Sequence, residues 1–151
     1  MRIFLVCVAV ALTAIGCNSN NNGGGSPTDP SQVNVEFSTT DLVVGTGAGP
    51  AGAGNQATLL FELWLYNAAG PASKGTRIQG STDAGVGPVM FVIGSGQFIA
   101  GFDQGVRGMR VGGKRRLYIP PSLAWGSAGA QGGIPPNASV VFEVELTNLT
   151  Q

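Results

Sequence analysis

The chain has 151 residues with eight basic and eight acidic side chains, so its formal net charge is zero and only 11% of its residues are charged. Without an excess of basic residues the chain is not expected to present a positively charged surface for phosphates, and we expect no nucleic-acid partner. The absence of histidine excludes Ser-His-Asp triads, histidine proton shuttles and the usual zinc sites.

The first segment has the layout of a bacterial secretory signal. One basic residue, Arg2, precedes an apolar run over residues 3–15, which is too short to span a bilayer comfortably. The sequence AIGC at residues 14–17 resembles a lipobox, in which cleavage precedes a lipidated cysteine. We predict a lipoprotein signal peptide over residues 1–16 and lipidation at Cys17. The alternatives are an ordinary cleaved signal and a retained membrane anchor.

The next segment, NSNNNGGGSPTDPSQ, contains no large apolar residue. Such a composition cannot bury enough surface to offset the entropy of ordering it, so we predict a flexible tether over residues 17–33. As a random coil it would reach roughly 20 to 25 Å from its anchor. Removal of Cys7 with the signal would leave Cys17 as the mature chain's one thiol, so no intramolecular disulfide is expected. We predict a lipid-anchored protein of the cell envelope, at the outer membrane on its periplasmic face or surface.

From residue 34 onward the pattern changes to short strands separated by glycine-rich turns. Residues 57–66, ATLLFELWLY, are apolar on nearly both faces and predict a central or covered strand. Shorter strands are predicted over residues 89–93 and over residues 115–119, where Pro120 ends the pairing. Residues 139–147 alternate most cleanly between apolar and polar positions.

One helix is predicted, over residues 102–109. Phe102, Val106 and Met109 fall at the i, i+4 and i+7 spacing of a single apolar face. Gly105 and Gly108 interrupt it, and each costs about 1 kcal/mol relative to alanine in a helix. The fold class is therefore α+β, with an antiparallel sheet, one short helix packed on its apolar face, and Phe102 at the cleft between them.

Residues 94–146 carry a specific set of motifs in a specific order: GMRVGGKRRLYIPP, an AWG turn and GGIPPNASVVFEVEL. In this order and spacing they closely resemble the FKBP-type peptidyl-prolyl cis-trans isomerases. The resemblance extends more loosely to WLY at 64–66 and DLVVGTGAG at 41–49. It implies an FKBP-type isomerase domain over residues 34–151, with a twisted antiparallel sheet wrapped around one short helix.

The resemblance also implies a substrate pocket lined by aromatic side chains, with Phe102 as its floor where most relatives have tryptophan. The Ile99 backbone N–H would donate to a substrate carbonyl, and Trp125 stands where a donor tyrosine is usual. Gln79 replaces an aspartate, so the pocket has no ionisable group. The implied catalytic residues are Phe61, Ile99, Phe102, Trp125 and Phe142. The implied substrate-binding residues are Ile78, Gln79, Val89, Phe98 and Ile134.

The implied reaction is rotation about X-Pro bonds of envelope proteins. It requires no nucleophile, metal or cofactor, because an apolar pocket favours the twisted amide, which has less charge separation than the planar one. Expected partners are proline-containing polypeptides and macrolide ligands, with membrane contact through the lipid anchor only, and a monomeric state. Two alternatives stay open: a catalytically weak FKBP-like peptide-binding or chaperone module, and a structural lipoprotein that only shares the fold.

Overall fold

The structure is a computed structural model, and it describes residues 33–151. The predicted signal peptide, Cys17 and all but the last residue of the predicted tether lie outside this range. Within it, no helix combines the length and the apolar character needed to cross a membrane.

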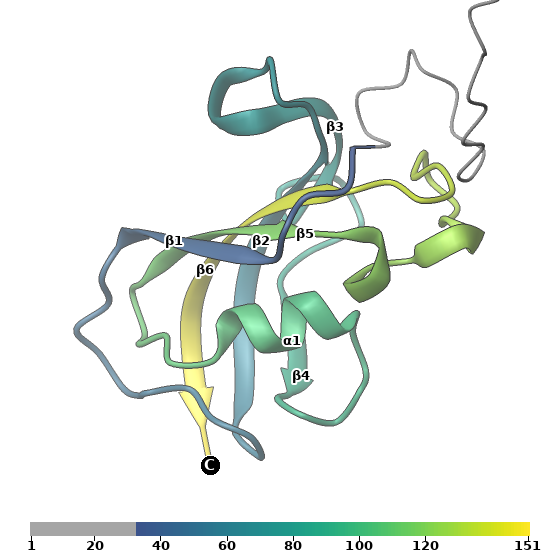
Figure 1. Cartoon of the computed structure of the whole chain (residues 1–151). Coiled ribbons are helices and arrows are strands. Elements are labelled where there is room, and N and C mark those ends of the chain that lie inside the picture. Colours follow the sequence, from purple (N-terminus) through teal and green to yellow (C-terminus); the bar gives the residue numbers. More distant parts are fainter. Residues whose placement is uncertain (1–32) are drawn as a thin grey trace, which may run out of the picture.

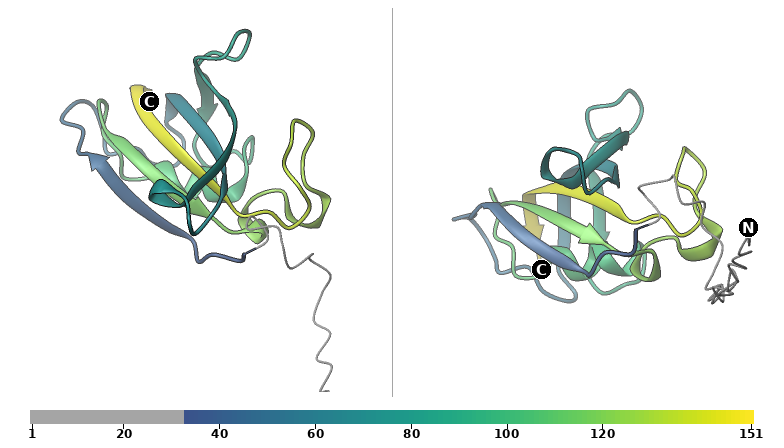
Figure 2. Two further views of the ribbon diagram at one scale, coloured as in Figure 1. Left: turned by 90° about the horizontal axis from the view of Figure 1, so that it is seen from above. Right: turned by 45° about the horizontal axis from the view of Figure 1, so that its top comes forward.

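Six strands form one antiparallel sheet (Figure 1). Five of them follow the order β1 (Ser38–Val43), β5 (Lys114–Ile119), β6 (Val140–Thr150), β2 (Gln56–Tyr66) and β3 (Lys74–Gly80). The sixth, β4 (Val89–Val92), pairs with the first part of β2, on the edge that β3 occupies further along. The views in Figure 2 show the twist of the sheet and the segment 120–139 projecting beyond one end of it.

The two long strands β2 and β6 pair over most of their length and supply much of the core. On β6, Val140, Phe142, Val144 and Leu146 are buried, whereas the glutamates between them are partly exposed. The buried positions of β2 also alternate, at every second residue from 57 to 63. This period-2 pattern places one apolar face of the sheet inward, as the sequence predicts.

The one α-helix among residues 33–151, α1 (Ala100–Val106), packs on the inner face of the sheet (Figure 1). It starts two residues earlier than predicted and ends at Val106, shortly before Gly108 takes a φ of +80°. The predicted apolar face is confirmed, because Phe102, Val106 and Met109 are all buried. Within the described residues, three single-turn 3-10 helices accompany these elements, at Pro71–Ser73, Pro121–Leu123 and Gly126–Ala128.

The glycines of α1 allow the helix to lie very close to β5. A Cβ on Gly105 would lie 2.7 Å from both terminal methyl groups of Leu117, and a Cβ on Gly101 would collide with Ile119. Leu117 and Ile119 are fully buried beneath the helix. The packing against β5 thus offsets the poor helix propensity of these residues.

Charged side chains form hydrogen bonds and an ion pair at both ends of α1. Buried Asp103 accepts a hydrogen bond from Gly94 N–H at 2.6 Å and pairs with Arg107 at 2.8 Å. Arg115, on β5, donates to the carbonyl oxygens of Gly105 and Arg107 at 2.9 and 2.8 Å. These bonds satisfy carbonyl groups that a helix C-terminus leaves without partners.

The outer face of the sheet carries a polar network centred on Glu143. Its carboxylate lies 2.7 Å from both Lys74 Nζ and Arg116 Nη2, and Lys74 Nζ lies 4.0 Å above the centre of the Trp64 ring. Partial burial acts to raise the pKa of Glu143, but the hydrogen bonds from Lys74 and Arg116 outweigh it and lower the pKa below its ordinary range. The network therefore links β3, β5 and β6 across the sheet.

Candidate active site

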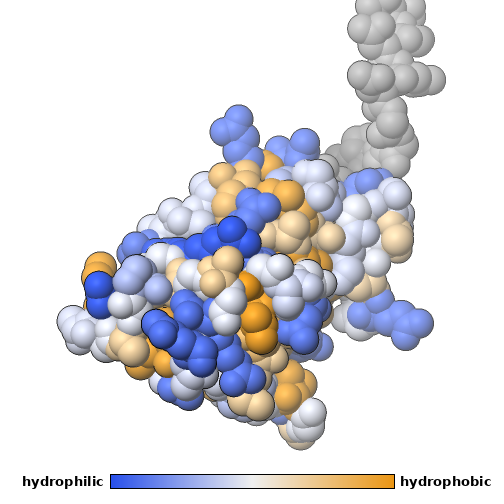
Figure 3. Space-filling model, turned by 90° about the horizontal axis from the view of Figure 1, so that it is seen from below, coloured by the Kyte–Doolittle hydropathy of each residue, from blue (hydrophilic) through white to orange (hydrophobic). Residues whose placement is uncertain are grey.

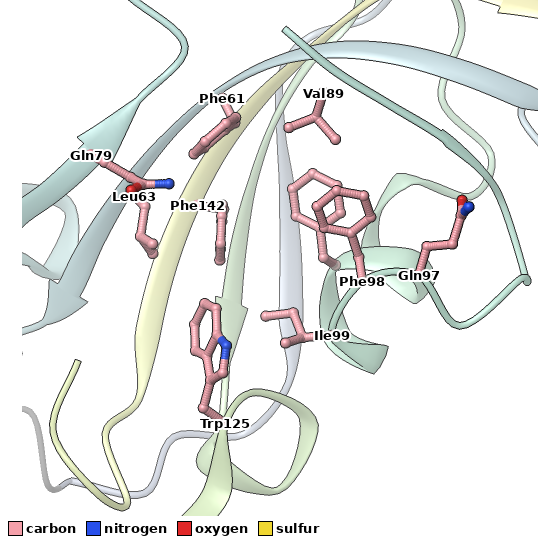
Figure 4. Close-up of a pocket in the computed structure, with 10 residues that line it drawn as sticks. Phe61, Leu63, Gln79, Val89, Gln97, Phe98, Ile99, Trp125 and Phe142 are labelled. Atoms are coloured by element: carbon pink, nitrogen blue, oxygen red, sulfur yellow. The ribbon is translucent and has the colours of Figure 1, made fainter. Parts of the chain in front are cut away.

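A hollow with a volume of about 500 Å³ opens between α1, the inner face of β2 and β6, and the segment that carries Trp125 (Figure 4). Its lining is mainly apolar. It consists of Phe61, Leu63, Gln79, Val89, Gln97, Phe98, Ile99, Phe102, Trp125 and Phe142.

Three phenylalanine rings form the base and back of this pocket. Phe102, in the first turn of α1, is 2% exposed, and its ring centre lies 5.1 Å from that of Phe142 in an edge-to-face arrangement. Phe61 lies 6.1 Å from Phe142 on the other side. Phe142 is held in place because it pairs with Leu63 and Leu117 on the two strands flanking β6. The pocket base is thus a contiguous apolar surface built on the central strands.

The side wall is formed by residues just before α1 and by the start of β4. Phe98 is 38% exposed, and its ring packs 5.0 Å from Phe91 and 5.5 Å from Phe102. Figure 4 shows Val89 and Phe98 on the same side of the hollow. The Phe98 ring therefore extends the buried aromatic cluster to the mouth of the pocket.

Ile99 joins this wall to the helix. Its carbonyl oxygen accepts hydrogen bonds from the N–H groups of Phe102 and Asp103, at 3.0 and 3.2 Å. Its own N–H has no hydrogen-bond partner among residues 33–151. A half-buried peptide donor next to an apolar pocket is available to a carbonyl group of a bound peptide.

The rim carries the polar atoms of the pocket, and none of the lining residues ionises between pH 2 and 12. Gln79 reaches the hollow from β3, and Trp125 lies opposite the phenylalanine rings (Figure 4). The Gln97 side chain accepts a hydrogen bond from Val92 N–H at 3.1 Å, so its amide holds the turn after β4. In the described part of the chain, no group of three or more His, Cys, Asp or Glu residues is placed to hold a metal ion.

The structure brings together most of the residues that the sequence assigns to the site. Eight line the pocket: Phe61, Gln79, Val89, Phe98, Ile99, Phe102, Trp125 and Phe142. Ile78 and Ile134 do not line it. Ile134 is buried and bridges to Ala130, and the end of the Ile78 side chain lies beside Gly133.

Two lining residues, Leu63 and Gln97, were not predicted. Leu63 lies two residues after Phe61 on the same face of β2, so the strand period could have identified it. No sequence signal distinguishes Gln97 from other loop glutamines.

A twisted antiparallel sheet around one helix, with a neutral aromatic pocket between them, defines a small domain with an apolar binding pocket. The sequence profile of a family described as "FKBP-type peptidyl-prolyl cis-trans isomerase" matches residues 47–147. The chain belongs to this family, and both the predicted fold class and the predicted enzyme class are confirmed.

Two individual relatives support this family assignment. The chain is 36% identical to the protein named FK506-binding protein 2 of Dictyostelium discoideum over 149 residues, which cover 99% of each chain. It is 42% identical over 106 residues to the FK506-binding protein of Neisseria meningitidis, covering 70% of this chain and 89% of the relative.

Solved structures show the same fold. The crystal structure of FkpA from Escherichia coli superposes with a TM-score of 0.62 at 30% identity, covering 76% of this chain and 48% of FkpA. A peptidyl-prolyl cis-trans isomerase from Pseudomonas syringae gives a TM-score of 0.60 at 31% identity and covers 76% of each chain. The protein is thus a peptidyl-prolyl isomerase of FKBP type.

Proposed function

We propose that the pocket binds the prolyl ring of a polypeptide substrate against the apolar base formed by Phe61, Phe102 and Phe142. The observation that carries this assignment is the unpartnered Ile99 N–H at the edge of a pocket without ionisable groups. A substrate carbonyl bound to that N–H would hold the X-Pro bond over the phenylalanine rings. Val89 and Phe98 would contact the flanking residues, and Gln79 and the Trp125 N–H would supply further hydrogen bonds at the rim.

The chemistry follows from the properties of the amide bond. An X-Pro bond rotates slowly because its amide must lose resonance on twisting. The planar amide carries more charge separation than the twisted one, so a dry apolar pocket disfavours the planar ground state relative to the transition state. In this mechanism the residues of the pocket bind, orient and exclude water, and none transfers a proton.

The test is a peptide isomerisation assay on the purified protein, with Phe102→Leu as the site variant. We expect the protein to accelerate cis-trans exchange of a short X-Pro peptide and to be inhibited by a macrolide ligand such as FK506. Absence of acceleration with retained FK506 binding would instead assign the domain to peptide binding alone.

We further propose that the protein is a lipoprotein of the bacterial cell envelope, made of a tether and an isomerase domain that starts near residue 34, and that it acts as a monomer on proline-containing segments of envelope proteins. The signal-like residues 1–16 and the cysteine that follows them support this location. On the face of the molecule in Figure 3, hydrophobic residues form several separate patches between hydrophilic ones, which is consistent with a monomer.

Lipidation can be tested by comparing two cysteine variants of the full chain. We expect Cys17→Ser to move the protein from the membrane fraction to the soluble fraction, whereas Cys7→Ser should leave it in the membrane fraction. Persistence of the Cys17→Ser protein in the cleaved, membrane-bound form would exclude acylation at this residue.

A further inference from the structure

The strand beside the pocket, β4, has a free edge. It pairs with β2 on one side only. Beyond its end, Ile93 continues that pairing, because its N–H donates to Asn55 O at 2.9 Å and its carbonyl accepts from Gly54 N–H at 2.8 Å. Backbone groups of successive residues in a strand point to opposite sides, so those of Val92 and Met90 point away from β2.

Only part of this free edge is used by the protein itself. The Val92 N–H donates to the Gln97 side chain, and the Val92 carbonyl accepts from Ser95 N–H, both at 3.1 Å. In this register the N–H and the carbonyl of Met90 face away from β2, and no turn, loop or side-chain hydrogen bond to either group occurs within residues 33–151. Met90 therefore presents one unused donor and one unused acceptor in strand geometry, directly after the pocket residue Val89.

The surroundings of this edge are apolar and uncharged. No charged residue occurs from residue 84 to residue 102, although charges flank the stretch at Asp83 and Asp103. Half of the large apolar side chains that are exposed in the described part of the chain lie within it: Val86, Met90, Val92 and Phe98. Met90 is 67% exposed. Edge strands are commonly protected from pairing by charges or bulges, and β4 carries neither.

We propose that β4 is a second binding surface, on which an extended apolar segment flanking the substrate proline adds as a further strand. Val89 makes this surface continuous with the pocket, because it both lines the pocket and begins β4. A client chain that leaves the pocket over Val89 meets the Met90 backbone next, with Phe98 on the inner side of the strand and Met90 and Val92 on the outer side. Strand addition of this kind gives affinity through main-chain hydrogen bonds and is tolerant of sequence.

The surface favours extended, apolar, unfolded polypeptides over short peptides or charged segments. The inference rests on the proposed function of the pocket, since the proline is what brings the flanking segment to β4.

The test compares two substrates and two variants of the full chain. One substrate is a tetrapeptide with a central X-Pro bond, and the other extends the same core on both sides with valine- and threonine-rich residues. We expect the protein to act on the extended peptide with a kcat/KM roughly tenfold higher, as two added backbone hydrogen bonds allow. Met90→Pro removes the outward N–H without touching the bonds to β2, and should lower this advantage by about threefold, the share of one of the two bonds.

Met90→Ala is the matched control, because it shortens the same side chain but keeps the backbone donor. It should retain most of the advantage of the extended peptide. N-methylation of the flanking substrate residues, one at a time, tests the same bonds without altering the protein. The methyl group should lower the kcat/KM of the extended peptide at every second position, where the substrate N–H faces β4.

Equal kcat/KM values for the two peptides, or an unchanged advantage in Met90→Pro, would overturn the inference while leaving the pocket assignment intact. A Met90-dependent dimer without any effect of substrate length would also overturn it, because the edge would then be occupied by a second copy of the chain. Failure to isomerise either peptide would instead refute the proposed function of the pocket.

Discussion

Phe102 belongs both to the core under α1 and to the base of the pocket. Its ring contacts those of Phe91, Phe98 and Phe142, and only 2% of its surface is exposed. Removing such a ring completely costs about 3 to 5 kcal/mol of folding free energy, a large share of the total for a domain. An alanine variant would therefore confuse loss of catalysis with loss of folding.

Phe102→Leu separates the two effects. Leucine keeps the site apolar and of similar volume, so we expect the free energy of unfolding to fall by less than about 1.5 kcal/mol. Loss of the aromatic contact with the prolyl ring should lower kcat/KM about fivefold. Peptide kinetics and urea unfolding of the same sample measure both quantities. An unchanged kcat/KM would mean that the prolyl ring does not rest on this side chain.

Trp125 offers a cleaner test of hydrogen bonding at the rim. Trp125→Phe keeps a ring at the pocket and removes the indole N–H, so we expect about a fivefold loss in affinity for a bound peptide or macrolide. Trp64→Phe is the matched control, because Trp64 lies under Lys74 and does not line the pocket. If both variants bind alike in a calorimetric titration, the indole N–H of Trp125 contributes no hydrogen bond.

At the scale of elements, the sequence predicts those strands whose own side chains form an apolar run or an apolar–polar alternation. The four predicted strands correspond to β2, β4, β5 and β6, with ends shifted by up to three residues. It did not predict β1, in which every residue is exposed, or β3, which contains two glycines and an exposed arginine. These two strands exist because a neighbour supplies the pairing, and a single-sequence pattern does not contain that information.

The same limit applies to the site. Residues on regular strands or next to α1, such as Phe61, Phe142 and Phe102, reach the pocket as the resemblance implies. Ile78 does not, and it lies on β3, whose register against β2 shifts twice. Such irregularities rotate side chains to other directions, and sequence spacing does not show where they occur.

The close packing of α1 on β5 predicts the effect of a single methyl group. Gly105→Ala gains about 1 kcal/mol of helix propensity but places Cβ against Leu117, at a cost of about 1 to 3 kcal/mol. We expect a net loss of about 1 kcal/mol in the free energy of unfolding, measured by urea denaturation. Gln104→Ala, on the exposed side of the same helix, should cause little change. Stabilisation by Gly105→Ala would show that the helix can move away from β5.

At the scale of the whole molecule, the Glu143 network predicts how stability depends on pH. The pKa of Glu143 is lowered from its ordinary value of 4.5 in the folded state. A carboxylate with a depressed folded pKa stabilises the protein above its unfolded pKa, and this contribution is lost as the pH falls through the folded pKa. We therefore expect stability to decline below about pH 4.5, in part because of this residue.

Glu143→Gln tests this expectation in thermal unfolding from pH 7 to pH 3. The variant should be about 1 kcal/mol less stable at pH 7, because it leaves Lys74 and Arg116 without their carboxylate. Its stability should also fall less steeply on acidification than that of the wild-type chain. Parallel pH curves would show that other carboxylates dominate the acid sensitivity.

In the proposed mechanism, a neutral apolar pocket promotes rotation of an amide bond without proton transfer. The most direct test of this mechanism is the kcat/KM for a short X-Pro peptide, measured from about pH 5 to pH 9. Because no lining residue ionises in this range, we expect a clear acceleration over the uncatalysed rate and a flat profile. A bell-shaped profile would contradict this mechanism, because it would require an acid or a base in the reaction.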